Sequence, residues 1–334
     1  MNIENLKKVE LHLHLDGSLR PQTLLDIAEK DNISLPTKDL EEIKKYMMVA
    51  EDNKDLVEYL KKFELPLKVM QSEENLERIA FELVEDLAKE NYMYAEIRFA
   101  PHLHAEKGLP LDKVIKSVTN GIERAEREYD IKSNIILCIM RHLGVEKGFE
   151  IVNLAKNYMG SKVVAIDLAG DEFNYPVTIF KDVFAEAKEN NIPITIHAGE
   201  ARGYESIVDS IKLGASRIGH GVRAYENINL IQELIDKNIF LECCAISNMN
   251  TQIFDDFYEY PFKNYLNKGI KVTINTDNRT VSNTNFKKEI EVLEKYNSVD
   301  KNEIIKSIKN SIYGAFISDK EKDILLKKLD FSSN

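Results

Sequence analysis

Eight short segments of the chain are rich in apolar residues, and longer segments with a different pattern separate them. Most of the eight are continuous apolar runs that turn polar at their C-terminal end. They are residues 9–15, 92–100, 134–142, 163–170, 192–199, 217–221, 239–247 and 271–277. Such runs predict strands buried on both faces, as in a parallel sheet covered by helices.

The segments between these runs repeat apolar residues at intervals of three and four, which is typical of amphipathic helices. Residues 72–90 and 226–238 show this pattern clearly. Strands that alternate with helices pair in parallel, and eight such units predict a closed barrel. We therefore expect an α/β protein, a (β/α)8 TIM barrel, that occupies residues 1–334 as a single domain.

The connection between the first two predicted strands is the longest. It contains three helix-like segments, at residues 20–30, 39–47 and 55–70. We expect a helical insertion after the first strand, and insertions at that face of a barrel tend to form lids. Further helix-like segments follow the last strand, at residues 285–296, 301–317 and 320–329. They predict extra C-terminal helices.

Composition and charge exclude several kinds of partner. The chain has 45 Lys and Arg against 56 Asp and Glu, a net charge of −11, so no basic field exists to neutralise nucleic-acid phosphates or anionic lipid. Its three cysteines, two of them adjacent, predict buried thiols and no disulfide framework. No apolar run reaches membrane-spanning length, and the first strand begins too early for a secretory segment. We expect a cytoplasmic protein that binds a small molecule, with its oligomeric state left open.

Two histidines share one face of the first predicted strand. In "VELHLHLDGSL" (9–19) side chains alternate, so His12 and His14 point to one side and the leucines between them to the other. Alone, this spacing fits ordinary buried histidines equally well. However, His197, His220 and Asp277 also stand where a predicted strand gives way to a loop. Those ends of parallel barrel strands meet at one mouth.

Three imidazoles and a carboxylate at that mouth suit zinc, which takes nitrogen and oxygen ligands and keeps an open position in catalytic sites. The expected ligands of one zinc ion are His12, His14, His197 and Asp277. His220 is then left to act on the attacking water. Glu200, three residues after a ligand, is placed for acid–base catalysis.

The remaining histidines have simpler interpretations. His102 and His104 repeat the His-x-His spacing, and residues 104–106 have the H-x-E of small zinc deaminases, but no P-C-x-x-C follows to complete that site. We expect His102 to be structural at a strand end and His104 to lie in a loop. His142, at the end of the third run, either lines the mouth or is structural, and the structural interpretation is the simpler one.

Six motifs occur in order along the chain: "HLHLDGSLRPQTL", "YAEIRFAPHLH", "AIDLAGDE", "TIHAGE", "RIGHG" and "INTDNRTVSNT". Together they resemble the adenosine deaminase family of metal-dependent barrel hydrolases. The match runs from about residue 7 to "DKEKDILLKKL" (319–329), nearly the whole chain. The resemblance implies zinc-dependent deamination of adenosine, and of 2′-deoxyadenosine, to inosine and ammonia in purine salvage.

The resemblance also implies catalytic roles. It makes the four residues named above the zinc ligands, and Asp277 would also accept a hydrogen bond from the attacking water. Glu200 would protonate the ring nitrogen beside the attacked carbon, which requires a neutral carboxyl group. His220 would act as the general base or as the electrostatic partner of the water.

Other positions would contact the substrate. By resemblance, the backbone N–H of Gly170 meets a purine nitrogen, Asp16 meets a ribose hydroxyl, and His14 touches the substrate. Many members have an aspartate where this chain has Asn278. An aspartate must be protonated to donate to the imidazole-ring nitrogen of the purine, whereas an amide donates at any working pH. The contact is therefore expected to survive, with base selectivity left open.

The insertion differs from the family's animal pattern. Leu60 and Phe63 are suggested as lid contacts, and packing of an amphipathic helix explains them equally well.

Three alternatives stay open. The first is a sister deaminase of adenine or of a phosphorylated or modified nucleoside. Adenine-specific relatives tend to have glutamate at the position of Asp16, and a nucleotide enzyme would need a basic cluster at the mouth. The second is a hydrolase of esters or amides with two metals, which the lack of a lysine at the mouth disfavours. The third is a non-catalytic purine-binding barrel, which the complete set of ligands and proton donor disfavours.

Overall fold

Eight parallel strands alternate with helices in the computed structural model, which describes residues 5–50, 53, 56–254 and 256–333. The strands are β1 (Lys8–His14), β2 (Tyr92–Phe99), β3 (Lys132–Met140), β4 (Val163–Ala169), β5 (Thr195–Ala198), β6 (Arg217–His220), β7 (Phe240–Cys243) and β8 (Lys271–Ile274). Each overlaps its predicted run. The run at 239–247 was predicted too long, because helix α11 begins at Ala245.

The strands form two parallel four-stranded sheets, in the orders β1-β2-β3-β4 and β5-β6-β7-β8. Single parallel bridges join them at both edges: Ile166 pairs with Ile194, and Leu13 pairs with Asp277. At the second junction the N–H of His14 donates to the carbonyl of Asp277 at 2.8 Å. The predicted (β/α)8 barrel is confirmed, with one difference: two of its eight junctions are single bridges instead of continuous ladders.

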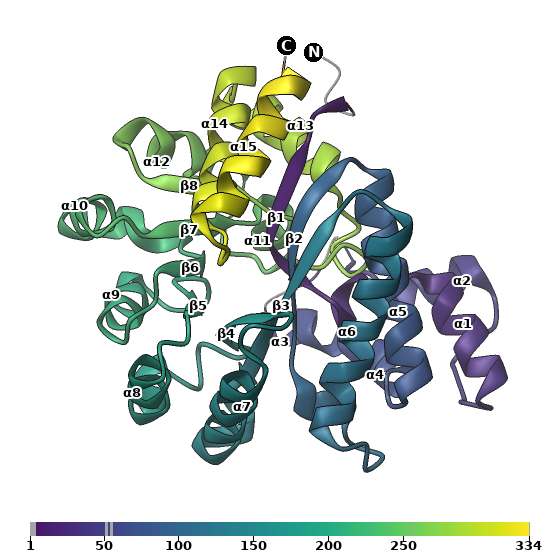
Figure 1. The fold of residues 1–334 in the computed structure, drawn as a ribbon. Coiled ribbons are helices and arrows are strands. Elements are labelled where there is room, and N and C mark those ends of the chain that lie inside the picture. The colour runs from purple at the N-terminus through teal and green to yellow at the C-terminus, as the bar shows by residue number, and fades with distance from the viewer. Residues whose placement is uncertain (1–4, 51–52, 54–55, 255, 334) are drawn as a thin grey trace.

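Helices surround these strands (Figure 1). Those between strands are α5 (Glu73–Lys89), α6 (Leu111–Glu128), α7 (Gly144–Tyr158), α8 (Lys181–Glu189), α9 (Tyr204–Lys212), α10 (Ile228–Asp236), α11 (Ala245–Asn250) and α12 (Phe262–Lys268). The side chain of Ser72 accepts the N–H of Asn75 and so begins α5. The amphipathic pattern of residues 72–90 and 226–238 thus gives α5 and α10, as predicted.

The helical insertion and the C-terminal helices are also present. The insertion contains α1 (Pro21–Lys30), α2 (Leu40–Met47), α3 (Leu56–Leu60) and α4 (Glu64–Val69), and the chain ends with α13 (Phe286–Asn297), α14 (Lys301–Gly314) and α15 (Asp319–Ser333). In Figure 1, α1 and α2 lie outside α5, and α14 lies beside α15 near the C-terminus. A capping box between Asp300 and Glu303 begins α14. Helix α14 contacts both β1 and β8 and so covers their junction.

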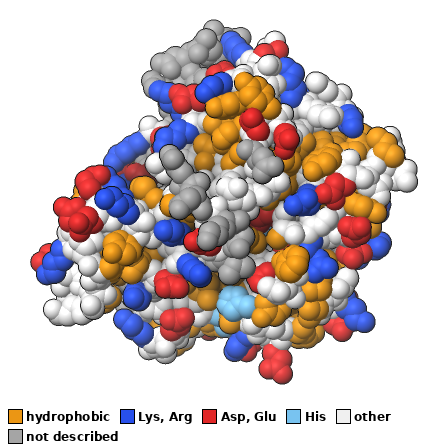
Figure 2. All heavy atoms as spheres, turned by 180° about the vertical axis from the view of Figure 1, so that it is seen from behind, with side chains coloured by type: hydrophobic (Ala, Val, Ile, Leu, Met, Phe, Trp, Pro, Cys, Tyr) orange, Lys and Arg blue, Asp and Glu red, His pale blue; other side chains and the backbone are white. Residues whose placement is uncertain are grey.

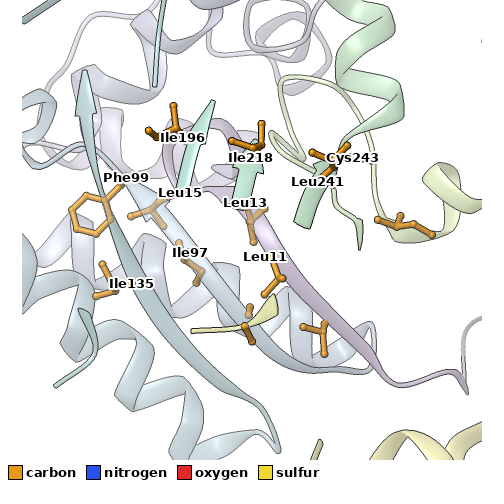
Figure 3. Packing of buried hydrophobic residues seen from close by; sticks show 14 of the residues in the cluster. Leu11, Leu13, Leu15, Ile97, Phe99, Ile135, Ile196, Ile218, Leu241 and Cys243 are labelled. Carbon is orange, nitrogen blue, oxygen red and sulfur yellow. The ribbon is translucent and has the colours of Figure 1, made fainter. Parts of the chain in front are cut away.

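One large apolar cluster connects the barrel to its helices, from Leu6 to Leu329. Leu11 and Leu13 of β1 and Leu15, which directly follows it, are fully buried in it, beside Ile97 of β2 and Leu241 of β7 (Figure 3). Because these leucines face the cluster, the histidines between them face the barrel interior. No helix in the described ranges is long and apolar enough to cross a membrane.

Candidate active site

A cavity of about 550 Å³ opens at the carboxyl ends of the strands. This is the size of a pocket for a small molecule. Its walls include predicted site residues and suggested lid contacts from the strand ends and the insertion: His14, Asp16, Leu60, Phe63, Gly170, His197, Glu200 and Asn278. His220, Asp277 and His142 line it as well. The polar strand ends that are far apart in sequence therefore meet at one mouth.

The four predicted metal ligands converge at the base of this cavity. One ligand atom from each of His12, His14, His197 and Asp277 lies within 4.8 Å of the others. Asp277 Oδ1 is 3.3 Å from the Nε2 atoms of both His12 and His14, and the Nε2 atoms of His14 and His197 are 3.2 Å apart. Strands β1 and β5 and the segment after β8 supply these groups.

Buried carboxylates orient two of these imidazoles. Glu242 Oε2 lies 2.8 Å from His12 Nδ1, and Asp167 Oδ2 lies 2.9 Å from His197 Nδ1. Arg98, itself fully buried, pairs with both carboxylates at 2.8 and 2.9 Å. Burial alone would raise the pKa of Asp167, but the charges of His197 and Arg98 hold it well below its usual range. Each carboxylate thus accepts the Nδ1 hydrogen and leaves the Nε2 lone pair directed inward.

The inward-facing atoms fit a metal ion. Among the described residues, His12 Nε2 and Asp277 Oδ1 are buried and have no hydrogen-bond partner. Ser247 donates to the other oxygen of Asp277 at 2.6 Å. A cluster of lone pairs without a donor is costly when buried, and a cation satisfies it. Nitrogen and oxygen donors of this kind suit a borderline-soft divalent ion.

Glu200 lies beside this cluster as a buried carboxyl group. Burial raises its pKa to about 8, and the negative charge of Asp277 adds to that effect. Thr251 donates to Glu200 Oε1 at 3.4 Å, and His220 Nε2 is 3.5 Å from Oε2. A carboxyl group that is neutral near pH 7 is able to donate a proton.

His220 is held in one tautomer. The amide Nδ2 of Asn248 is 3.0 Å from His220 Nδ1, and an amide nitrogen only donates. Burial lowers the pKa of His220 well below its usual range, so the ring is neutral and its hydrogen is on Nε2. Both His220 and Asp277 have positive φ, at 63° and 56°, a strained backbone conformation for such residues that occurs at functional sites.

Three residues that the resemblance assigns to substrate binding lie around the cavity. Burial raises the pKa of Asp16 to about 6, although the N–H of Gly17 donates to it at 3.0 Å. Gly170 has φ of 95°, and a Cβ there would lie 3.2 Å from Met140 Cε. The Oδ1 atom of Asn278 is buried without a hydrogen-bond partner in the described part of the chain.

The other histidines lie outside the metal cluster. His102 pairs with Glu150 at 2.8 Å in a short 3-10 helix after β2. The prediction that His104 lies in a loop was wrong, because His104 is the last residue of that 3-10 helix. Its side chain is fully buried against Phe99, and burial lowers its pKa to about 4. His142 is exposed and lines the mouth, so the simpler structural interpretation was wrong.

Several residues that orient the site were missed from the sequence. They are Arg98, Asp167, Glu242, Ser247 and Asn248. A signal existed for the first three, because each is a charged residue inside an otherwise apolar strand. The pattern alone does not show which strands bring these charges together.

Comparison with known proteins agrees with this geometry. The sequence pattern of the adenosine deaminase family matches residues 7–332. An adenosine deaminase of Clostridium botulinum strain Loch Maree is 47% identical over 327 residues, 97% of each chain. Among solved structures, adenine deaminase from Arthrobacter aurescens has a TM-score of 0.90 at 25% identity and covers 97% of this chain and 98% of its own. Arabidopsis ADAL complexed with IMP has a TM-score of 0.88 at 26% identity and covers 99% and 98%. This chain belongs to the adenosine deaminase family.

Proposed function

We propose that this protein is a zinc-dependent adenosine deaminase that converts adenosine and 2′-deoxyadenosine to inosine and ammonia in purine salvage. The observation that carries the proposal is a set of inward-facing lone pairs beside a carboxyl group that burial keeps neutral. Relatives that are 47% identical over 97% of the chain are named adenosine deaminase, which supports the substrate.

In this proposal the ligands of one zinc ion are His12, His14, His197 and Asp277. When bound, such an ion supplies Lewis acidity and makes water acidic enough to lose a proton near neutral pH. Glu242 and Asp167 keep the imidazoles in the ligating tautomer.

The chain's own groups then move the protons. Glu200 donates its proton to the ring nitrogen beside the attacked carbon, which makes that carbon more electrophilic. His220 carries hydrogen on Nε2, and this favours the electrostatic and hydrogen-bonding role over that of a general base. Asp277 accepts a hydrogen bond from the attacking water and orients it.

We assign the substrate contacts to the cavity walls. The N–H of Gly170 meets a purine nitrogen, and the amide of Asn278 donates to the imidazole-ring nitrogen. Asp16 accepts a ribose hydroxyl, and His14 contacts the substrate from the ligand side. Leu60 and Phe63 cover the apolar face of the base from the insertion.

The mouth favours a neutral nucleoside over a nucleotide. Among the described residues on the insertion and outer loops that line the cavity, Lys61 is the only basic one, whereas Glu64, Glu106 and Asp171 are acidic. A 5′-phosphate would meet net repulsion there. The preference for a neutral nucleoside differs from the Arabidopsis relative, whose structure holds the nucleotide IMP.

We also infer that residues 1–334 form one catalytic domain, because a single apolar cluster joins its first and last elements. On the face in Figure 2, acidic and basic side chains are interspersed and neither sign forms a continuous patch. This supports a small-molecule partner over a nucleic acid or a membrane. The cytoplasmic location stays a prediction.

The test is ultraviolet absorbance of purified protein with adenosine, adenine and AMP, each before and after chelation. We expect a change with adenosine that chelation abolishes and zinc restores. A change only with adenine or AMP would support the deamination chemistry but assign a different substrate. No change with any of the three would contradict the proposal.

A further inference from the structure

Glu172 is a buried acid just outside the cavity walls. It follows β4 in the motif "DLAGDE", and its side chain is 1% exposed. The described residues form no ion pair with it within 4.0 Å, although the charge of the buried Arg141 acts on it. A carboxylate buried in this way requires other groups to stabilise its charge.

Five donors from one loop and the helix after it supply that stabilisation. Oε1 accepts the N–H of Gly199 at 2.8 Å and the hydroxyl of Ser206 at 2.5 Å. Oε2 accepts the N–H groups of Glu200 at 3.0 Å, Ala201 at 2.6 Å and Arg202 at 3.0 Å. All five partners donate, which is the pattern of an ionised carboxylate.

Four successive N–H groups that converge on one anion fix the course of the backbone. The loop between β5 and α9 thus takes its shape from Glu172. Gly199 begins this turn with φ of 67°, which glycine adopts without strain.

Glu200 lies in the middle of this loop and is held from both sides. Its N–H donates to Glu172, and its carbonyl accepts from Arg223 Nε at 3.1 Å. With both of its backbone polar groups held, the direction of its Cα–Cβ bond is set. The carboxyl group of Glu200 is thereby placed in the cavity beside His220 and Thr251.

We propose that Glu172 is a positioning residue for the deamination: it folds the loop 199–202 and so places the proton-donating carboxyl group of Glu200. The proposal rests on the proposed function, in which Glu200 is the proton donor. The negative charge of Glu172 also helps burial and Asp277 to keep the pKa of Glu200 high.

The test is a double-mutant cycle with Glu172→Gln and Glu200→Gln. Glu172→Gln keeps the size of the side chain but removes the charge and one acceptor oxygen. We expect its kcat for adenosine to fall about 10- to 100-fold, because small misplacements of a catalytic group have effects of that size. KM and the zinc content should change less than about twofold.

In the Glu200→Gln background, Glu172→Gln should change kcat by less than about twofold, because there is no proton donor left to place. A purely structural role predicts instead that the two losses multiply. Multiplied losses, or an unchanged kcat in Glu172→Gln, would overturn the proposal.

Two further variants keep the test decisive. Glu321→Gln removes a carboxylate that accepts the N–H and hydroxyl of Ser318 far from the cavity, and it should leave kcat unchanged. If thermal unfolding shows that Glu172→Gln does not fold, Ser206→Ala takes its place. It removes one of the five donors and should lower kcat about threefold. A change confined to KM would contradict the proposal.

The same experiments separate this proposal from the proposed function. If the unmodified protein does not release ammonia from adenosine, or if Glu200→Gln is fully active, the proposed function fails and the role of Glu172 fails with it. If both behave as expected and only the cycle fails, the deaminase function stands.

Discussion

At the scale of single residues, the protonation state of Glu200 should set the upper pH limit of the reaction. Its pKa in the free protein is raised to about 8 by burial. The neutral, donating form is therefore present below that pH and lost above it. We expect kcat/KM for adenosine to fall about tenfold per pH unit above pH 8, since kcat/KM reports groups of the free enzyme. A profile that stays flat to pH 10 would contradict this.

Substitution of the same residue supplies the control. Glu200→Gln keeps the shape but cannot donate a proton from a carboxyl group. It should lower kcat by about two orders of magnitude or more, while zinc content and the affinity for inosine stay near the original values. Zinc content by atomic absorption and inosine binding by calorimetry check this.

Asn278 carries a second prediction at this scale. An amide donates to the purine without a change in protonation, whereas an aspartate donates only when protonated. Asn278→Asp should therefore make KM for adenosine rise with pH between about pH 6 and 8, if burial raises the pKa of the new carboxyl group as it does for Asp16. The unmodified protein should show no such rise in KM. A KM in the variant that does not depend on pH would place residue 278 away from the base.

At the scale of elements, the strands bring the ligands together only where small residues let them approach. A Cβ on Gly219 of β6 would lie 2.9 Å from His12 Cε1 and 3.2 Å from the backbone of His197. Gly219→Ala should displace the His12 ring from the position in which its Nε2 atom faces the metal site. We expect zinc affinity to fall about 10- to 100-fold, the range found when the groups that orient a ligand are changed.

Competition with a chromogenic chelator measures that affinity. The matched control is Ser216→Ala, at the exposed position directly before β6, which should bind zinc as the unmodified protein does. If Gly219→Ala binds zinc as tightly as the unmodified protein, the prediction is wrong and the His12 ring is displaced without loss of zinc affinity.

At the scale of the whole molecule, the metal cluster joins the two sheets. His12 and His14 belong to the sheet β1–β4, whereas His197 belongs to the sheet β5–β8 and Asp277 follows its last strand. In the described part of the chain, single bridges are the backbone pairing that joins these sheets. A bound ion should therefore stabilise the closed barrel beyond its local contacts.

Removal of the metal should lower Tm by about 5–10 °C, from the linkage of binding to folding and the size of the chain. Calorimetry before chelation, after it and after zinc is restored measures the change. In Asp277→Ala the Tm should respond far less to the chelator. Identical Tm values with and without zinc in the unmodified protein would exclude a role of the metal in joining the sheets.

The order of strands and helices and most of the candidate site could be predicted from the amino-acid sequence. Apolar periodicity is local, so it locates each strand, and the carboxyl ends of parallel barrel strands necessarily meet. The sequence thus predicts His12, His14, His197, Glu200 and Asp277 as site residues. The C-terminal end of β7 could not be predicted in this way, because the apolar run continues into α11.

The contacts that hold those residues in place depend on the folded barrel. Arg98 donates hydrogen bonds to Asp167 and Glu242, which are 69 and 144 residues away in sequence. Glu172 accepts the N–H of Glu200, which is 28 residues away in sequence. Such contacts depend on the register and closure of the barrel, which no local pattern encodes. Buried charges require partners in low dielectric, so folding selects the one arrangement that pairs them all. That arrangement, and not the motif alone, sets the tautomers of the histidines and the neutral form of Glu200.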